Sequence, residues 1–156
     1  MSPRFILISL PFFMNLLAGT STFPAGELIE GRLRPCPNRP NCVTSDSSSD
    51  SSDNNTIVPI RFQNSPEDAW QKIQLILARL GGDICKTTST YIWATYTSKF
   101  FSFVDDVELR MEPEKKVIHI RSGARVGYFD FNVNRRRVEK IRKLIAEQEP
   151  KDEQGK

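Results

Sequence analysis

The chain has 156 residues, which is enough for one domain, and 38% of them are hydrophobic while 26% are charged. This composition is ordinary for a soluble globular protein and excludes the collagen-like, membrane and wholly disordered classes. The formal net charge of +3 is too small to indicate a protein that coats nucleic acid, so no nucleic-acid partner is expected.

Residues 1–25 are predicted to be a secretory signal peptide. Arg4 precedes an apolar run over residues 5–18, and small residues follow that run. The run is shorter than the roughly 20 apolar residues that a membrane-spanning helix needs. We therefore expect a cleaved signal and an exported protein that is periplasmic or secreted.

Residues 26–44 are rich in cysteine and proline and include the stretch "LRPCPNRPNC". The spacing of Cys36 and Cys42 is too wide for a common zinc motif or a CxxC redox pair, and no second pair follows. In an exported protein this pattern favours a local disulfide. The sequence leaves open whether the segment folds back over the arginine-rich bend described below or stands apart as a handle for a partner.

The next segment, residues 45–55, consists mainly of serine and aspartate and is predicted to be a flexible linker. The folded domain is expected over residues 56–147, followed by a disordered tail at 148–156. "TIVPIRF" predicts a short strand at its start. A helix follows, with Ser65 as its N-cap, Pro66 in its first turn and glycines at its end. Its expected buried face consists of Ala69, Trp70, Ile73, Leu77 and Leu80.

Four strands are predicted next, over residues 83–87, 90–98, 103–112 and 116–122, because they alternate or are rich in β-branched and aromatic residues. Within the first of them, Cys85 is expected to be buried, although an odd cysteine in an exported protein can also pair between chains. A turn over residues 112–115 joins the last two strands into a hairpin. The final helix, residues 133–147, is expected to bury Val138, Ile141, Leu144 and Ile145. The predicted fold is a single α+β domain, an antiparallel meandering sheet with two helices packed on one face, in the order β-α-β-β-β-β-α.

A polar cluster is predicted on the hairpin. Alternation places Asp106 and Glu108 on the same face as His119 and Arg121, where cross-strand pairs form. One interpretation is a hydrolase, with or without a metal, that uses Asp105, Asp106, Glu108 and His119. The other is a set of ordinary ion pairs. No nucleophile elbow, phosphate loop or HExxH pattern accompanies these residues, so we predict no catalytic residue, no cofactor and no metal site.

Arginines 135–137 fall in the first turn of the final helix, where the helix dipole disfavours positive charge. A negative partner is therefore expected nearby. It is either internal, from Asp105, Asp106 or Asp130, or an external phosphate or carboxylate. The binding residues predicted around this arginine-rich bend are Arg121, Ser122, Arg125, Asp130, Asn134, Arg135 and Arg137.

Several motifs together resemble the domain of unknown function 1499 family (DUF1499): "LRPCPNRPNCV", "SPEDAW", "FVDDVELR" and "IRSGARVGYFDFNVNRRRVEKIR". The resemblance extends from Leu33 to Leu144 and implies an α+β domain, often with an export signal, but no activity. This chain has Gly123 and Ala124 where the family usually has a second serine. The family-like positions are Cys36, Pro37, Pro40, Asn41, Cys42, Asp105, Asp106, Glu108, Arg121, Ser122, Arg125, Gly127, Asp130, Asn134, Arg135 and Arg137.

The favoured functional hypothesis is a non-catalytic exported domain. Its arginine-rich bend would bind an anionic small molecule, a lipid head group or a protein partner of the cell envelope, and a membrane surface also fits. The hydrolase is the alternative. A third interpretation is that the polar network only stabilises the domain and that the partner contacts lie elsewhere.

Overall fold

The structure is a computed structural model that describes residues 25–46 and 54–148. Nearly all of the predicted signal peptide, most of the predicted linker and nearly all of the predicted tail lie outside the described residues. No helix in the described ranges is long and apolar enough to cross a membrane.

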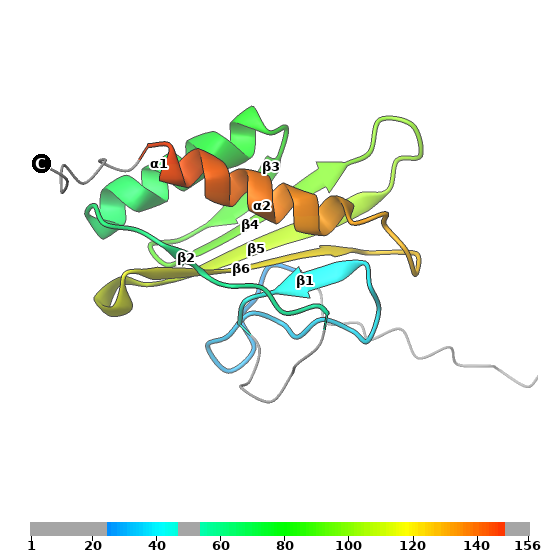
Figure 1. The fold of residues 1–156 in the computed structure, drawn as a ribbon, viewed down its shortest axis with the longest axis horizontal. Helices are drawn as coiled ribbons and strands as arrows, with labels where there is room; N and C mark the ends of the chain where they lie inside the picture. The colour runs from blue at the N-terminus through cyan, green and yellow to red at the C-terminus, as the bar shows by residue number, and fades with distance from the viewer. Residues whose placement is uncertain (1–24, 47–53, 149–156) are drawn as a thin grey trace, which may run out of the picture.

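Within the described residues, six strands form one antiparallel sheet in the order β1-β6-β5-β4-β3, and β2 also pairs with β6. Figure 1 shows both helices on the same face of this sheet. The α+β class and the order β-α-β-β-β-β-α, counted from β2, are therefore confirmed. The elements are β1 (Cys42–Thr44), β2 (Ile60–Arg61), α1 (Pro66–Arg79), β3 (Asp83–Thr87), β4 (Tyr91–Thr97), β5 (Val104–Glu112), the 3-10 turn η1 (Pro113–Lys115), β6 (Val117–Ala124) and α2 (Val133–Ala146).

Helix α1 begins and ends as its sequence predicts. The Ser65 hydroxyl accepts a hydrogen bond from the Asp68 backbone N–H at 3.1 Å, and Pro66 occupies the first turn, where a missing N–H costs nothing. Gly81 follows the helix with a φ of +84°. The helix buries Ala69, Trp70, Ile73 and Leu77 as predicted, and also Ile76.

The β5–β6 hairpin has the predicted alternation. Val107 and Leu109 on β5 and Ile120 on β6 are fully buried in the core under the helices. The register pairs Glu108 with Arg121 and therefore places both on the opposite face. One face of the sheet is thus apolar and the other is charged.

Three local features differ from the sequence-based expectations. Cys85 is exposed, so its predicted burial is wrong: β3 lies at the edge of the sheet and all of its residues are exposed. The strand β1 was not predicted, because three residues are too few to show an alternating pattern. The predicted strand at residues 56–62 is reduced to Ile60–Arg61.

We call residues 25–46 the N-terminal strap. Its first part contacts the sheet face opposite the helices, and its last part includes the strand β1. The backbone at Gly26 lies against the indole of Trp93, and a Cβ at Gly26 would approach a ring atom within 2.7 Å. Gly26 also has a φ of +103°, which disfavours any larger residue. Further along the strap, Leu33 is buried and its backbone N–H donates to Asp46 at 2.9 Å. The charged face of the sheet is therefore covered.

Candidate functional site

The predicted polar residues separate into two clusters on opposite faces of the sheet. Successive residues of a strand point to opposite sides, so Asp105 and Ser122 lie on the helix side while Asp106, Glu108, His119 and Arg121 lie on the strap side. The two groups therefore form separate networks.

On the strap side, the centre of the cluster is the carboxylate of Glu108, which is fully buried. Arg34 of the strap donates to it from Nη2 at 2.8 Å, Arg121 from Nη1 at 3.2 Å, and the Tyr91 hydroxyl at 2.7 Å. Burial, and then the charge of Arg34, lower the pKa of Arg121. Burial and the Glu108 charge raise the pKa of Tyr91, so this hydroxyl stays a donor. The predicted cross-strand pair is confirmed, and the strap adds a second guanidinium to it.

A second buried carboxylate, Asp46, belongs to the strap itself. Arg110 of β5 binds it with two hydrogen bonds of 2.8 and 2.9 Å, and the Leu33 N–H adds a third. Burial alone would raise the pKa of Asp46, but these hydrogen bonds outweigh it and hold the pKa below its ordinary value. His119 lies with Nδ1 at 3.7 Å from Asp46 and Nε2 at 3.2 Å from Glu112.

The third strap-side carboxylate is Asp106 at the start of β5. Arg125 donates to both of its oxygens at 2.9 and 3.1 Å, and the indole N–H of Trp93 donates at 2.8 Å. The hydrogen bond that Arg125 donates to Asp106 raises the pKa of Arg125. Arg125 of the arginine-rich bend is therefore bound by a carboxylate of the same chain.

On the helix side, Arg137 of α2 pairs with Asp105 at 2.7 Å. Its guanidinium also lies 4.5 Å from the centre of the Tyr96 ring. Burial raises the pKa of Tyr96 to about 12. Ser122 is fully buried and donates to the Asn134 side chain at 2.5 Å, and Arg137 donates to both groups.

The negative partner expected at the start of α2 is internal. Asp130 accepts from the backbone N–H groups of Asn132 at 3.0 Å and Asn134 at 2.9 Å, and so places a carboxylate at the positive end of the helix dipole. The remaining arginines of the triplet donate to backbone carbonyls, Arg135 to Asn54 and Arg136 to Phe131.

The cysteine-proline stretch folds back onto this bend. Cys36 and Cys42 form the predicted disulfide. Asn41, beside it, is buried; its side chain donates to the Gly127 carbonyl at 2.7 Å, and its own carbonyl accepts from the Ala124 N–H at 3.0 Å. Gly123 faces Cys42 across the strands, and a Cβ there would lie 2.9 Å from the Cys42 sulfur. The glycine at this position is therefore required by the disulfide.

The residues of the hydrolase hypothesis do not converge. Asp105 lies on the other side of the sheet from Glu108 and His119, and Glu108 is bound by two guanidinium groups. Asp106 is bound by the Arg125 guanidinium and the Trp93 indole. No group of three or more metal-binding side chains is found among the described residues.

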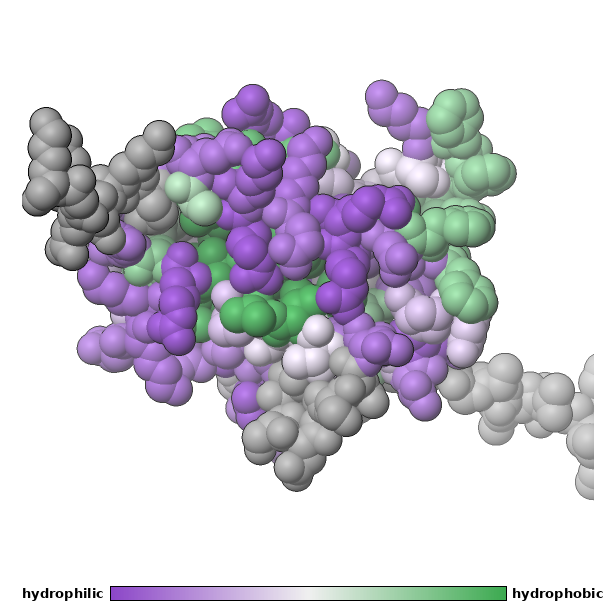
Figure 2. Space-filling view, viewed as in Figure 1, coloured by the Kyte–Doolittle hydropathy of each residue, from purple (hydrophilic) through white to green (hydrophobic). Residues whose placement is uncertain are grey.

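Sequence analysis missed a group of exposed hydrophobic side chains at one end of the sheet. They lie on two loops: residues 98–103 between β4 and β5, the first aromatic loop, and residues 125–132 between β6 and α2, the second aromatic loop. Figure 2 shows hydrophobic side chains along this end of the molecule. The "KFFSF" and "VGYFDF" stretches were a usable signal in the sequence, because their aromatic residues have neither the alternation of a strand nor the spacing of a helix that would mark a buried face. The residues and their exposed fractions are Phe100 92%, Phe101 74%, Phe103 54%, Val126 58%, Tyr128 57%, Phe129 71% and Phe131 84%.

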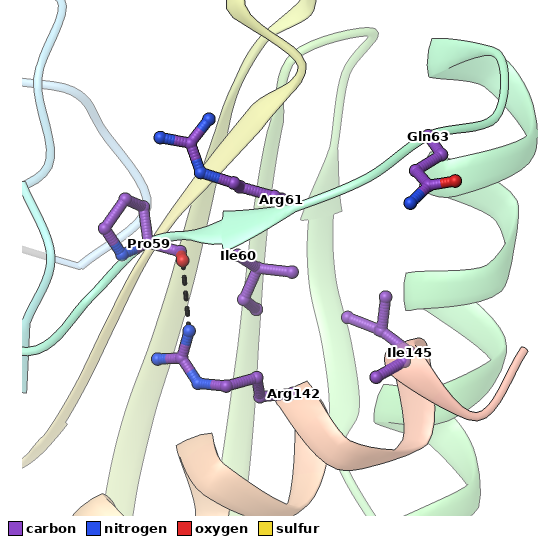
Figure 3. Close-up of a pocket in the computed structure, with 7 residues that line it drawn as sticks. Pro59, Ile60, Arg61, Gln63, Arg142 and Ile145 are labelled. Carbon is purple, nitrogen blue, oxygen red and sulfur yellow. Dashed lines mark hydrogen bonds between the residues drawn. The ribbon is translucent and has the colours of Figure 1, made fainter. Parts of the chain in front are cut away.

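A hollow of about 490 Å³ lies between β2 and the end of α2. Ile60 and Ile145 form its apolar wall (Figure 3), and Arg142 crosses it to donate to the carbonyl of Pro59 at 3.0 Å. In this view Arg61 extends to the other side of β2. The guanidinium of Arg142 thus links α2 to the segment before β2.

Comparison with known families gives one match. Residues 32–145 match the model of the family described as "Protein of unknown function (DUF1499)", and the matched range includes most of the chain. No curated protein matches the sequence.

Proposed function

The chain belongs to this family, and we propose that its domain is a non-catalytic binding module of an exported protein whose contact surface is formed by the two aromatic loops. The export assignment comes from the signal-like N-terminus, and the disulfide is consistent with an extracytoplasmic protein. The single observation that carries the binding assignment is the exposure of seven large hydrophobic residues on two adjacent loops.

The amount of exposed aromatic surface supports a contact role. With about 150 Å² for one fully exposed ring, the exposed fractions of the six rings amount to roughly 650 Å² or more. The largest apolar patch of a typical monomer measures about 300–600 Å², and patches of that size often mark contact sites. Scattered single hydrophobic residues such as Leu75 on α1 need no such explanation.

The arginines support the same proposal by their internal contacts. A bend that bound an anion through guanidinium groups would present them to solvent, whereas Arg121, Arg125 and Arg137 bind the chain's own carboxylates. We therefore assign these groups to holding the bend in place. This choice develops the interpretation in which the polar network is structural and the partner contacts lie elsewhere.

The second aromatic loop is held in place by hydrogen bonds. Phe131 and Asn132 both have positive φ values, 53° and 60°, which are uncommon for residues with side chains. The Asp130 carboxylate and the Asn41 amide hold this loop through the hydrogen bonds described above. Strained backbone that is held by surrounding contacts is frequent at binding sites.

Site-specific photocrosslinking in cells tests this proposal. A benzophenone amino acid is placed at Phe101, at Phe129 or, as a control of matched exposure, at Leu75, which is 72% exposed on α1. We expect one adduct that is shared by the two loop positions and absent at position 75. Adducts at all three positions, or none at the loops, would contradict the proposal.

A further inference from the structure

We propose that the two aromatic loops dock on the surface of a lipid bilayer, with the rings entering the interface and the neighbouring cations lying at the level of the phosphates. This inference rests on the proposed function and names its partner. The loops share one end of the sheet, since the backbone N–H of Arg125, at the start of the second loop, donates to the carbonyl of Val104, directly after the first loop, at 3.0 Å.

The shape of the surface favours a bilayer. The most exposed rings, Phe100 at 92% and Phe131 at 84%, belong to different loops. A protein partner needs a complementary cavity for each protruding ring, whereas the bilayer interface accepts aromatic side chains without a shaped receptor. Ring pairs within each loop, Phe101 with Phe103 at 5.6 Å and Tyr128 with Phe129 at 4.9 Å between centroids, keep the rings together.

The charges near the rings agree with an anionic bilayer. The two loops carry two basic residues, Lys99 and Arg125, and one acid, Asp130. Arg125 is paired with Asp106, so the exposed Lys99 is the cation that these loops offer to the bilayer. The Asp130 carboxylate is turned inward, where it accepts the N–H groups at the start of α2. Arg136, one turn into α2, is exposed as well. A cation near the surface of an anionic membrane is attracted to it, and salt weakens this attraction.

The first experiment measures whether the loop enters the bilayer. Phe101→Trp is compared with Leu75→Trp, since these positions are 74% and 72% exposed. Of the two native tryptophans, Trp70 is buried and Trp93 is half-buried, and their signal is taken from the parent. Full-length protein is mixed with vesicles of phosphatidylcholine and phosphatidylglycerol whose acyl chains carry bromine, which quenches indole fluorescence on contact. We expect quenching and a blue shift for Phe101→Trp beyond those of the parent, and no such change for Leu75→Trp.

The second experiment measures affinity for the same vesicles by sedimentation. Residues 5–18 are themselves apolar, so all comparisons are made between variants of the same full chain. Changing Phe101 and Phe129 together to serine is expected to weaken binding at least roughly tenfold, from the loss of two partly buried rings. Leu75→Ser is the matched control and is expected to bind like the parent. Omitting phosphatidylglycerol or adding salt is expected to weaken binding.

The outcomes separate the two proposals. Equal quenching at positions 101 and 75, or unchanged affinity in the serine variant while its melting temperature is normal, overturns bilayer docking. If bilayer docking fails and the crosslinking experiment gives one protein adduct at both loops that is reproduced with that protein purified, the binding module stands and its partner is a protein. If neither lipid nor protein contacts the loops, both proposals are wrong.

Discussion

Replacing Glu108 with glutamine is expected to destabilise the domain strongly. The carboxylate is fully buried and receives hydrogen bonds from Arg34, Arg121 and the Tyr91 hydroxyl at 2.7–3.2 Å. The substitution removes the negative charge that Arg34 and Arg121 share, at a place where their side chains are only 13% and 9% exposed.

The magnitude follows from the burial of this cluster. Removing one partner of a buried ion pair costs about 3–5 kcal/mol, because the remaining charge stays desolvated. Against a total stability of about 5–15 kcal/mol this is a large fraction. The corresponding fall in melting temperature is roughly 10–20 °C for a domain of this size.

Urea unfolding of the parent and of Glu108→Gln, followed by circular dichroism, measures this loss as a change in the midpoint at constant slope. Glu139→Gln on α2 is the control, because that carboxylate is 54% exposed and pairs with Arg142 on the surface, where an ion pair contributes about 0–1 kcal/mol. In a double-mutant cycle, adding Arg121→Met is expected to give a combined loss smaller than the sum of the single losses. A loss below about 1 kcal/mol for Glu108→Gln would refute the argument that this network holds the strap on the sheet.

Two further predictions concern the strap and its carboxylates. Replacing both Cys36 and Cys42 with alanine is expected to lower the free energy of unfolding by about 2 kcal/mol, which is the chain-entropy value for a short closed loop. The control is Cys85→Ala at an exposed position, which is expected to change the free energy of unfolding little in the same urea assay. Asp46 and Glu112 have lowered pKa values when folded, the latter moving from 4.5 to about 2 through hydrogen bonds from Lys115 and then Arg110. Both carboxylates therefore contribute stability above the unfolded pKa that is lost as the pH falls from about 4.5 towards 2, and melting curves over this range that stayed level or rose would contradict the assignment.

The fold was largely predictable from local patterns. The apolar spacing in α1 and the alternation in β5 and β6 reflect a sheet that has helices on one face. Burial at Cys85 was predicted wrongly because a strand at the sheet edge is exposed on both faces, and a short β-branched segment carries no sign of its position in the sheet.

The candidate site was predictable only in part, for a physical reason. Alternation placed Glu108 and Arg121 on the same face of the sheet, but it could not predict that they are buried. The strap that covers them has no periodic sequence pattern of its own. The strap's contact with this face joins Arg34 and Glu108, which are 74 positions apart. Such a pairing is set by tertiary packing and leaves no trace in either segment alone. The aromatic loops lacked periodicity too, and that lack was the only sign in the sequence that their rings would stay outside the core.

Hydrogen bonds through Asn41 link the cysteine-proline stretch to the second aromatic loop. The disulfide encloses Asn41, whose side chain holds the Gly127 carbonyl inside the loop. The Asn41 carbonyl also accepts from the Asn134 side chain at 3.2 Å, and that side chain donates to Asp130 at 2.9 Å. Both ends of the loop are therefore fixed through a residue that the disulfide positions. The loop contains positive-φ positions that need such support. Breaking the disulfide therefore removes part of what holds the aromatic rings of this loop in place. We expect the loss of the disulfide to affect the binding surface as well as the stability of the strap.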